Sequence, residues 1–519
     1  MVEAFVVYNT YRVEGSQAYV YLYGRQEDGK TFLTKNKCKP YFYIKKSDEK
    51  AAKGLAASIT FEKTNKVDFD QKKLVKGVLS NPKDVPDLRD SLHKADIKTY
   101  EADIRFTYRF MIDNSIQGSC DIQGKPQQHS HVDCFYDEPT FQSTDYVPEN
   151  LTTLAIDIET GKMGKQLYCI SLVSSTGESE VLMVSDQPVE GTTVYTTEKE
   201  CLEAFTAAVR KYDPDIITGW SVIDYDLSVL KNLCEANHVP FILGRSDDRL
   251  RIKTESQFLR ESSADIVGRM VLDGIVLLKT SFVRLTDYKL NTAASEILGE
   301  KKLISGKNKL QEIEDAYRND KAKLGAYCKR DSELVLEILA KKKLIALTIK
   351  RSTLTGMQLD RVKGSIASLD NVYLRELAKR GIVANTHTFI EKPEAITGGY
   401  VMDSTPGIYD YVIVCDFKSL YPSIMRTLNI DPLSYVQKKH LKKSTAEFIV
   451  AANGAVFRNE EGILPQILER LHAARDQAKK EKDTVAIGAI KVLMNSFFGV
   501  LASPQCRFFS MAVANAITS

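Results

Sequence analysis

The stretch LAIDIET, residues 154–160, places two carboxylates, Asp157 and Glu159, inside an apolar run. Side chains alternate between the two faces of a β-strand, so residues two apart point the same way. Burying like charges side by side is costly unless a positive group lies between them. A pair of divalent cations is the leading explanation. The stretch therefore predicts a strand that carries a metal site on one face.

The bulk composition limits the class of protein. A chain of 519 residues is too long for one core and is expected to divide into about three or four domains. The sequence contains no run of about 18 apolar residues, so it does not predict a membrane span. The opening residues lack the pattern of a secretory signal. The nine cysteines form no CxxC pair. These features favour free thiols in a reducing cytoplasm and argue against a zinc site.

The distribution of charge is only mildly informative. The net charge of +3 does not decide whether the chain binds nucleic acid. Between Ser434 and Lys491, eleven Lys or Arg outnumber seven Asp or Glu. By itself this excess is as typical of a solvated helical surface as of a DNA-binding one.

The first hundred residues are predicted to form mainly β-structure. Residues 17–25 and 39–46 are aromatic-rich strands, and EDGK at residues 27–30 is typical of a hairpin turn. From Asp113 to Tyr146 the composition turns polar, which predicts a linker or a loop-rich connection.

Residues 151–350 alternate apolar strands with helical stretches, the pattern of an α/β domain. We expect strands at residues 151–159, 167–175 and 215–220, a helix at 198–212, and a long helix from about residue 324 through 350. Beyond these we expect a helix over 364–382, a strand over 410–417 that leads into a Pro-containing turn, and helices again after Pro465.

Three further residues extend the acidic pair. Asp226 lies near a predicted helix start, and Tyr327 and Asp331 are four apart on one face of the long helix. Asp157, Glu159, Asp226 and Asp331 are thus four carboxylates able to converge on two Mg²⁺ or Mn²⁺ ions, with Tyr327 orienting the attacking water. Taken singly, each piece is more typical of an exposed strand edge, a helix N-cap or a pair of surface neighbours.

A second group of candidates begins at Asp416, where the predicted strand ends. An acid in that place can hold a metal ion, and the backbone N–H groups that follow can receive triphosphate oxygens. The ring of Tyr421 is placed to lie beneath a sugar and exclude a 2′-hydroxyl. The alternative is a buried strand followed by an Asp-initiated turn.

Basic residues on two predicted helices follow. Arg475 and Lys479 lie one turn apart, as do Lys491 and Asn495. Such residues can face a common anion, and Lys491 can neutralise charge that develops on a transferred triphosphate. Without further context, basic residues on a helix are more typical of a solvated surface than of an anion site.

The order of these motifs resembles that of one family. DIET, YDLSVL and YCKRD look like the three exonuclease motifs of the DEDDy 3′–5′ exonuclease domain of family B DNA polymerases, and DFKSLYPSI and KVLMNSFFG resemble polymerase motifs A and B. KPYFYIKK and NPKDVPDLRDSL are similar to its N-terminal domain, and FFGVLASPQCRFF to the branch that contains bacterial DNA polymerase II and its archaeal relatives.

The resemblance implies a multidomain α/β and α+β fold. Residues 1–150 correspond to a β-rich N-terminal domain with a linker, 151–350 to a ribonuclease H-like exonuclease domain, 351–415 to the connection and the start of the palm, and 416–519 to a partial palm with helical fingers.

The resemblance also implies the chemistry and the partners. A mispaired 3′ nucleotide is removed at the four carboxylates, with frayed single-stranded 3′ ends preferred. Asp416 becomes a palm metal ligand and Tyr421 the sugar-excluding residue. The resemblance assigns contacts with the incoming dNTP to Arg475, Lys479, Lys491 and Asn495. Of these, Lys479 matches the family motif less well. Primer–template DNA, two Mg²⁺ or Mn²⁺ ions per site, a sliding clamp and a nucleoid location in the cytoplasm complete the expectation, with no membrane.

Two positions depart from the pattern. The second exonuclease motif usually carries an asparagine where Ser221 stands, and motif B usually ends in a tyrosine where Phe498 stands.

GGYV at residues 398–401 resembles the segment past which template backbone runs.

The third polymerase motif of the family, Asp-Thr-Asp, does not occur in the sequence. We therefore expect a truncated sequence, a fragment or one half of a split polymerase that a partner completes, and impaired polymerisation by this chain alone. The alternatives are a protein that works only as a 3′–5′ DNA exonuclease, and a noncatalytic DNA-binding scaffold.

Overall fold

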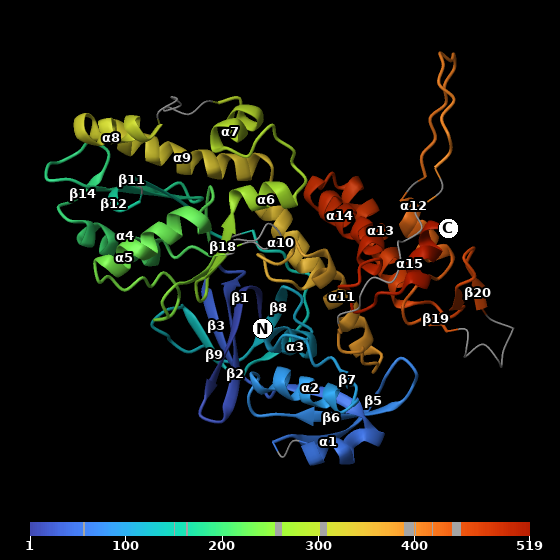
Figure 1. Ribbon diagram of the computed structural model, residues 1–519. Coiled ribbons are helices and arrows are strands. Elements are labelled where there is room, and N and C mark those ends of the chain that lie inside the picture. Colours follow the sequence, from blue (N-terminus) through green and yellow to red (C-terminus); the bar gives the residue numbers. More distant parts are fainter. Residues whose placement is uncertain are drawn as a thin grey trace.

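The computed structural model describes residues 1–55, 58–149, 151–161, 164–254, 262–300, 309–388, 399, 401–417, 419–437 and 448–519. Figure 1 shows β-sheets at the N-terminal end of the chain, a further sheet flanked by helices, and a C-terminal group of helices. This arrangement confirms the multidomain α/β organisation expected from the sequence.

Two sheets form the N-terminal region. A six-stranded sheet has the order β10-β8-β1-β2-β3-β9, and a four-stranded sheet has the order β5-β6-β4-β7. The strands are β1 Val2–Glu14, β2 Gln17–Gln26, β3 Thr31–Lys37, β4 Tyr41–Lys45, β5 Thr60–Val67, β6 Lys73–Val78, β7 Thr99–Tyr100, β8 Ser119–Gln123, β9 Cys134–Asp137 and β10 Thr140–Gln142. The helices are η1 Lys46–Asp48, α1 Glu49–Leu55, α2 Asp84–Lys94 and α3 Phe106–Asp113.

The sequence predicted one connection here correctly and another only in part. β2 and β3 are antiparallel, and Gly29 adopts φ 86° in the turn between them, which confirms the expected hairpin. The linker or loop-rich connection expected from Asp113 to Tyr146 is correct for most of its length, but 12 of its 34 residues form β8, β9 and β10, which join the six-stranded sheet. These strands are three to five residues long, too short for the alternation of apolar residues to stand out.

A third sheet has the order β14-β13-β12-β11-β15-β18. β11 pairs antiparallel with β12 and parallel with β15, so β11 lies inside the sheet. α4 packs on one face, and α9 packs across β11, β12 and β13 on the other (Figure 1). The elements are β11 Thr153–Gly161, β12 Gln166–Ser174, β13 Ser179–Val184, β14 Thr193–Tyr195, α4 Glu198–Tyr212, β15 Ile216–Gly219, η2 Ile223–Leu227, α5 Ser228–Ala236, β18 Met270–Asp273, α6 Gly274–Thr280, α7 Leu290–Leu298, α8 Lys309–Asn319 and α9 Lys321–Lys341. The short strands β16 Arg251–Lys253 and β17 Ser263–Asp265 pair separately.

Asp215, just before β15, ties the third sheet to the N-terminal one. Its carboxylate accepts hydrogen bonds from Arg25 of β2 at 2.6 Å and from Arg245 at 2.9 Å. Burial opposes ionisation of this carboxyl, but the charges of Arg245 and Arg25 hold the pKa of Asp215 below its usual range. The ion pair with Arg25 therefore joins one sheet to the other, and Arg245 neutralises the second oxygen of Asp215.

The predicted long helix is two helices. α9 ends at Lys341 and α10 spans Leu344–Thr355, because Lys343 adopts the left-handed conformation with φ 52°. α11 spans Ser365–Lys379, which confirms the helix expected there.

The C-terminal region is mostly helical, as predicted. It comprises α12 Leu420–Thr427, α13 Ile463–Lys480, α14 Thr484–Leu501, α15 Met511–Thr518 and a small sheet of β19 Tyr435–Val436, β20 Phe448–Val450 and β21 Val456–Arg458. α13 begins before Pro465, which is tolerated in a first helical turn. α14 is long and apolar enough to cross a membrane, but its apolar residues pack with those of α11 and α13 in one core.

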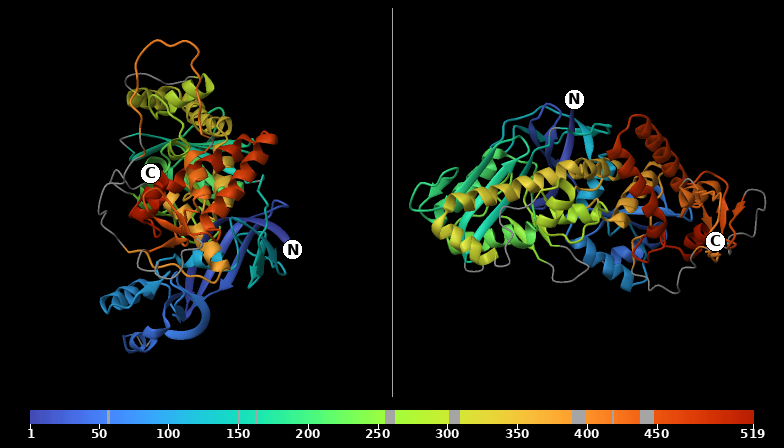
Figure 2. Two further views of the ribbon diagram at one scale, coloured as in Figure 1. Left: turned by 90° about the vertical axis from the view of Figure 1, so that its right-hand side faces the viewer. Right: turned by 90° about the horizontal axis from the view of Figure 1, so that it is seen from above.

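The strand predicted over residues 410–417 is not formed in the described structure. Residues 401–417 have no regular structure and are exposed, with Val414 88% and Tyr411 100% accessible. They belong to an orange excursion that projects away from the helices (Figures 1 and 2). A strand exists only beside a neighbour that accepts and donates its backbone hydrogen bonds, and no described segment pairs with this one.

Candidate functional site

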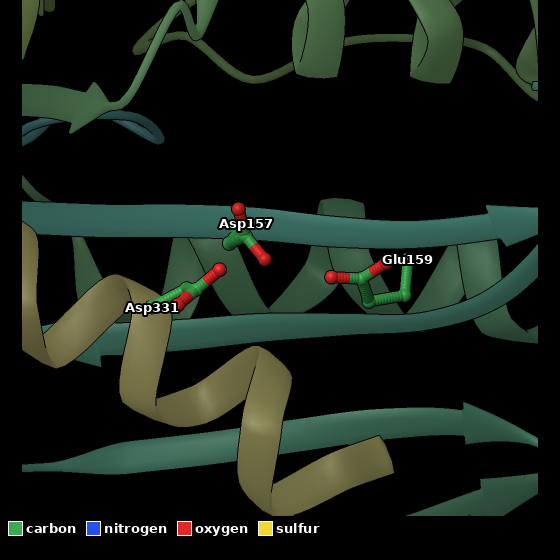
Figure 3. Close-up of side chains that lie close together, drawn as sticks. All are labelled: Asp157, Glu159 and Asp331. Atoms are coloured by element: carbon green, nitrogen blue, oxygen red, sulfur yellow. The ribbon is translucent and has the colours of Figure 1, made fainter. Parts of the chain in front are cut away.

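Asp157 and Glu159 lie on β11, on the face of the sheet that α9 covers (Figure 3). On the neighbouring strand β12, Ser171 pairs with Asp157 and Cys169 pairs with Glu159. Both carboxylates point to the same side, as the alternation predicted. Glu159 is buried and Asp157 is half-buried, so water screens their mutual repulsion poorly.

Asp331 of α9 completes a group of three carboxylates. One oxygen from each of Asp157, Glu159 and Asp331 lies within 4.8 Å of the others, and Figure 3 shows the three side chains facing a common point. Three like charges at that spacing repel, and a cation between them removes the repulsion. Carboxylate oxygens are also the donors that hard divalent cations prefer. The donor set therefore fits a divalent metal centre.

Buried hydroxyl and thiol groups hold α9 against the sheet. The hydroxyls of Ser171 and Ser332 share a hydrogen bond of 2.6 Å, and Ser171 also donates to the Cys328 carbonyl at 3.0 Å. The Cys328 thiol donates to the Asp157 carbonyl at 3.4 Å. Sequence reasoning missed these residues. The available signal was a serine inside the apolar strand β12 and another directly after Asp331.

Tyr327 lies one turn before Asp331 and is fully buried. Burial, the charges of Asp331 and Glu159, and a hydrogen bond to Asp331 raise the pKa of Tyr327 far above its usual range. The phenol therefore keeps its proton at neutral pH. It lies among the carboxylates as a hydrogen-bonding group rather than as a base.

Asp226 occupies a single π-helical turn, η2, beside the same strand. β15 pairs with β11 only as far as Ala155, and beyond that point Oδ1 of Asp226 accepts the Ile158 N–H at 3.1 Å. Burial, with the charge of Glu159 adding to it, raises the pKa of Asp226 well above its usual range. In the described structure Asp226 thus lies next to the group of three carboxylates without belonging to it.

The turn that presents Asp226 has an unusual backbone. Ser221, where the resemblance expects asparagine, adopts φ 63°, a left-handed conformation in which asparagine is enriched among residues other than glycine. Asp273 fixes this turn by accepting the Val222 N–H at 2.8 Å while it caps α6. Asp273 is a second positioning residue that the sequence did not reveal.

The candidates of the second group lie mainly on α12, α13 and α14. The ring of Tyr421 packs on Phe498, with centroids 4.7 Å apart, so the two motifs that carry them do meet. A Cβ placed on Gly399 would lie 4.0 Å from the Tyr421 hydroxyl, whereas Gly398 lies outside the described residues. Asp416 is exposed within the irregular segment 401–417, away from the strand end at which we expected it.

The basic candidates occupy two adjacent helices. Lys491 and Asn495 are both exposed on α14, as their spacing predicted. On α13, Arg475 is half-buried, and Lys479 is exposed and pairs with Asp476 at 3.1 Å. α13 packs against α14, so these side chains come from neighbouring elements.

Comparison with known proteins defines the class. The chain matches the model of the DNA polymerase family B exonuclease domain over residues 97–293 and that of DNA polymerase family B over residues 351–519. The first range includes Asp157, Glu159 and Asp226. Tyr327 and Asp331 fall between the two ranges.

Individual relatives agree. The chain is 34% identical to DNA polymerase II of Escherichia coli (strain K12) over 437 residues, which cover 82% of this chain and 54% of that protein. It is 27% identical to a DNA polymerase of Desulfurococcus sp. (strain Tok), covering 85% of this chain and 55% of that protein. The solved structure of the family B DNA polymerase from Pyrobaculum calidifontis matches with a TM-score of 0.80 at 23% identity, covering 99% of this chain and 70% of that chain.

The sheet with its converging carboxylates lies mainly within the range that matches the family B exonuclease domain, and the helices that follow lie within the range that matches DNA polymerase family B. The chain belongs to family B of the DNA polymerases. It spans about half the length of the curated relatives it matches.

Proposed function

We propose that this chain is part of a DNA-templated DNA polymerase and that its own best-formed activity is a 3′–5′ DNA exonuclease. The convergence of Asp157, Glu159 and Asp331 around one point, with the phenol of Tyr327 among them, carries the proposal. Two Mg²⁺ or Mn²⁺ ions would be held by these three carboxylates and by Asp226. We place the protein with DNA in the cytoplasm, where dNTPs and primer–template DNA are its substrates.

The residues have distinct roles in hydrolysis. Divalent cations, when bound, supply a nucleophile from water at neutral pH and neutralise charge on the phosphate. Tyr327 keeps its proton and donates a hydrogen bond to Asp331, so its oxygen is left to accept a hydrogen bond from the attacking water. The water oxygen forms a bond to phosphorus and the bond to the 3′ oxygen breaks. A nucleoside 5′-monophosphate leaves, and the shortened strand keeps its 3′-hydroxyl.

The site favours a strand end over an intact duplex. Asp157 and Glu159 lie beneath α9, and Asp331 is 3% exposed. A phosphodiester reaches carboxylates at that depth only when the terminal nucleotides are unpaired. The preference for frayed ends that proofreading requires therefore follows from the burial of the site.

The nucleotide-transfer site is proposed on Asp416, Tyr421, Arg475, Lys479, Lys491 and Asn495. Tyr421 would lie under the sugar, and the side chains on α13 and α14 would contact the triphosphate. Asp416 needs a strand beside it and a further carboxylate to hold two ions. A polymerase segment that supplies both, as a partner or in the same polypeptide, completes the site in this proposal.

The exposure of Asp416 favours a second candidate, a protein that works as an exonuclease alone. To separate the two, the chain is incubated with Mg²⁺, dNTPs and a labelled primer–template, with and without a separately expressed C-terminal polymerase segment. Extension that depends on the segment supports the polymerase. Degradation in both reactions supports the exonuclease. If the chain shows neither extension nor degradation, the remaining candidate is a DNA-binding scaffold.

The exonuclease site has its own test. The double variant Asp157→Ala plus Glu159→Ala is expected to lose digestion of a 5′-labelled single strand while it keeps the circular dichroism spectrum of the parent. Normal digestion by this folded variant would refute the assignment of the carboxylates.

A further inference from the structure

Arg351 of α10 is a buried cation with no described counter-charge. It is 7% exposed, and one terminal nitrogen donates to the Thr280 carbonyl at 3.1 Å. Its Nε and its other terminal nitrogen make no hydrogen bond within the part of the chain that the structure describes. Burial lowers the pKa of Arg351 below its usual range. A guanidinium in such a place is stabilised when an anion binds it.

A second unsatisfied group faces the same space. Ser368 of α11 is 1% exposed, and among the described residues its hydroxyl has no hydrogen-bond partner. Arg351 and Ser368 line one cavity of about 50 Å³, together with Lys363 and Thr355. That volume holds about four water oxygens, the number of oxygens in one tetrahedral anion. The cavity thus has the size, the charge and the donors for a phosphate group.

The small cavity adjoins a much larger one. Arg351, Thr280 and Lys363 also line a cleft of about 950 Å³ between the N-terminal region, α6 and α11. Arg105 and Arg361 stand on its walls, and burial and the charge of Arg361 lower the pKa of Arg105. Cations from separate parts of the chain therefore face one volume that is large enough for nucleotides.

The carboxylates of this cleft are largely engaged elsewhere. Asp103 and Asp370 both bind Arg507, each with a shortest contact of 2.8 Å. Asp273 accepts backbone N–H groups of α6 and of Val222. Asp360 lies 3.8 Å from Arg361, the weakest of these pairs. None of these acids forms an ion pair with Arg351 in the described structure.

We propose that Arg351, Ser368 and Lys363 form a phosphate-binding subsite, and that its ligand is a backbone phosphate of a DNA strand lying in the 950 Å³ cleft. The inference rests on the proposed function, since it requires that the chain binds DNA. A water molecule can satisfy the hydrogen bonds of Arg351 but cannot neutralise its charge, whereas a phosphate does both. The size of the adjoining cleft favours a polynucleotide over a free ion.

The test measures binding of single-stranded DNA by fluorescence anisotropy at several salt concentrations. The double variant Asp157→Ala plus Glu159→Ala serves as the parent, so that the DNA stays intact. Adding Arg351→Met is expected to weaken binding and to make the slope of log K against log salt shallower by about 0.7, the loss of one single-strand phosphate contact. Lys363→Met should have a similar effect, and Ser368→Ala should weaken binding without changing the slope.

The matched control is Arg318→Met, which removes an exposed arginine of α8 that pairs only loosely with Glu314. It should leave both the affinity and the slope as in the parent. Thermal denaturation adds a second readout, because inorganic phosphate should raise the Tm of the parent but not that of the Arg351→Met variant. Without phosphate the variant should melt no lower than the parent, since the substitution removes an uncompensated buried charge.

The outcomes separate the hypotheses. Unchanged affinity and slope in Arg351→Met and Lys363→Met overturn the subsite. Phosphate-dependent stabilisation with an unchanged DNA slope overturns DNA as the ligand and leaves a site for free phosphate. A lower Tm with no loss of binding makes Arg351 a structural residue. A parent that binds no DNA at all refutes the proposed function instead. If the Arg351→Met variant does not fold, the slope of log K against log salt measured for the Lys363→Met variant decides between the outcomes.

Discussion

The repulsion among the carboxylates of Asp157, Glu159 and Asp331 makes a quantitative prediction for Asp331→Asn. At 4.8 Å and an effective dielectric constant of 20, each pair of charges repels by about 3.5 kcal/mol. The partial exposure of Asp157 relieves much of this repulsion in the folded protein. We therefore expect the substitution to stabilise the metal-free chain by about 1–3 kcal/mol. Asparagine can still accept the hydrogen bond from Tyr327.

Metal ions should reverse the order of stability. In the proposed metal site, Mg²⁺ at 100 times its dissociation constant would stabilise the parent by about 2.7 kcal/mol, and the variant would lack one ligand for it. With about 2.1 cal/mol/K of unfolding entropy per residue over roughly 200 residues, thermal denaturation of the region around β11 in EDTA should therefore place the variant about 2–7 °C above the parent. Mg²⁺ should then raise the Tm of the parent selectively. Digestion of single-stranded DNA should fall more than about 100-fold, since even the loss of an outer partner of a metal ligand costs 10–100-fold.

The control is Asp315→Asn, an exposed acid of α8 that contacts Gln311. It should change the free energy of unfolding by less than about 0.5 kcal/mol in either buffer. An Asp331→Asn variant that is less stable than the parent in EDTA, and that responds to Mg²⁺ as the parent does, would refute the electrostatic reasoning.

Three further predictions concern other parts of the chain. Ser221→Asn should raise the free energy of unfolding by about 0.5–1 kcal/mol, because asparagine adopts φ 63° more readily than serine, and a lower urea midpoint would contradict this. Asp215→Asn should cost about 3–5 kcal/mol, because the guanidiniums of Arg25 and Arg245 lose a buried counter-charge. Folding lowers the pKa of Asp215, so the stabilisation that its charge gives is present above about pH 4 and is lost as the pH falls further. The part of the acid-induced decrease in the urea midpoint that comes from Asp215 should therefore be absent in the variant. Tyr421→Ala should admit ribonucleotides in primer extension with the complementing segment, and unchanged sugar selectivity would count against the role of Tyr421.

Local patterns predicted the elements that local interactions determine. The helix expected at residues 198–212 has those bounds in the structure, because Thr197 and Glu200 form a capping box that the sequence displays. The strand around Asp157 formed because its alternation matches a buried face. Asp331 could be matched to this strand only by family resemblance, since no local rule relates residues so far apart in the chain.

The errors occurred where tertiary structure decides. Three consecutive lysines, residues 341–343, continue a helical pattern, and only the left-handed backbone of Lys343 separates α9 from α10. The run from Tyr411 to Phe417 has the composition of a strand but lacks a described neighbour to pair with. Ser171 and Ser332 became recognisable as partners only when the helix was seen on the sheet.

The exposed run from Ile408 to Phe417 also affects how the chain behaves in a test tube. β-branched and aromatic side chains, on a backbone that no described segment pairs with, act as a template on which other copies add strands. Concentrated samples should therefore lose monodispersity, and light scattering should increase with protein concentration. A lysine in place of Val414 interrupts the apolar run with a charge and is the natural solubilising change for crystallisation.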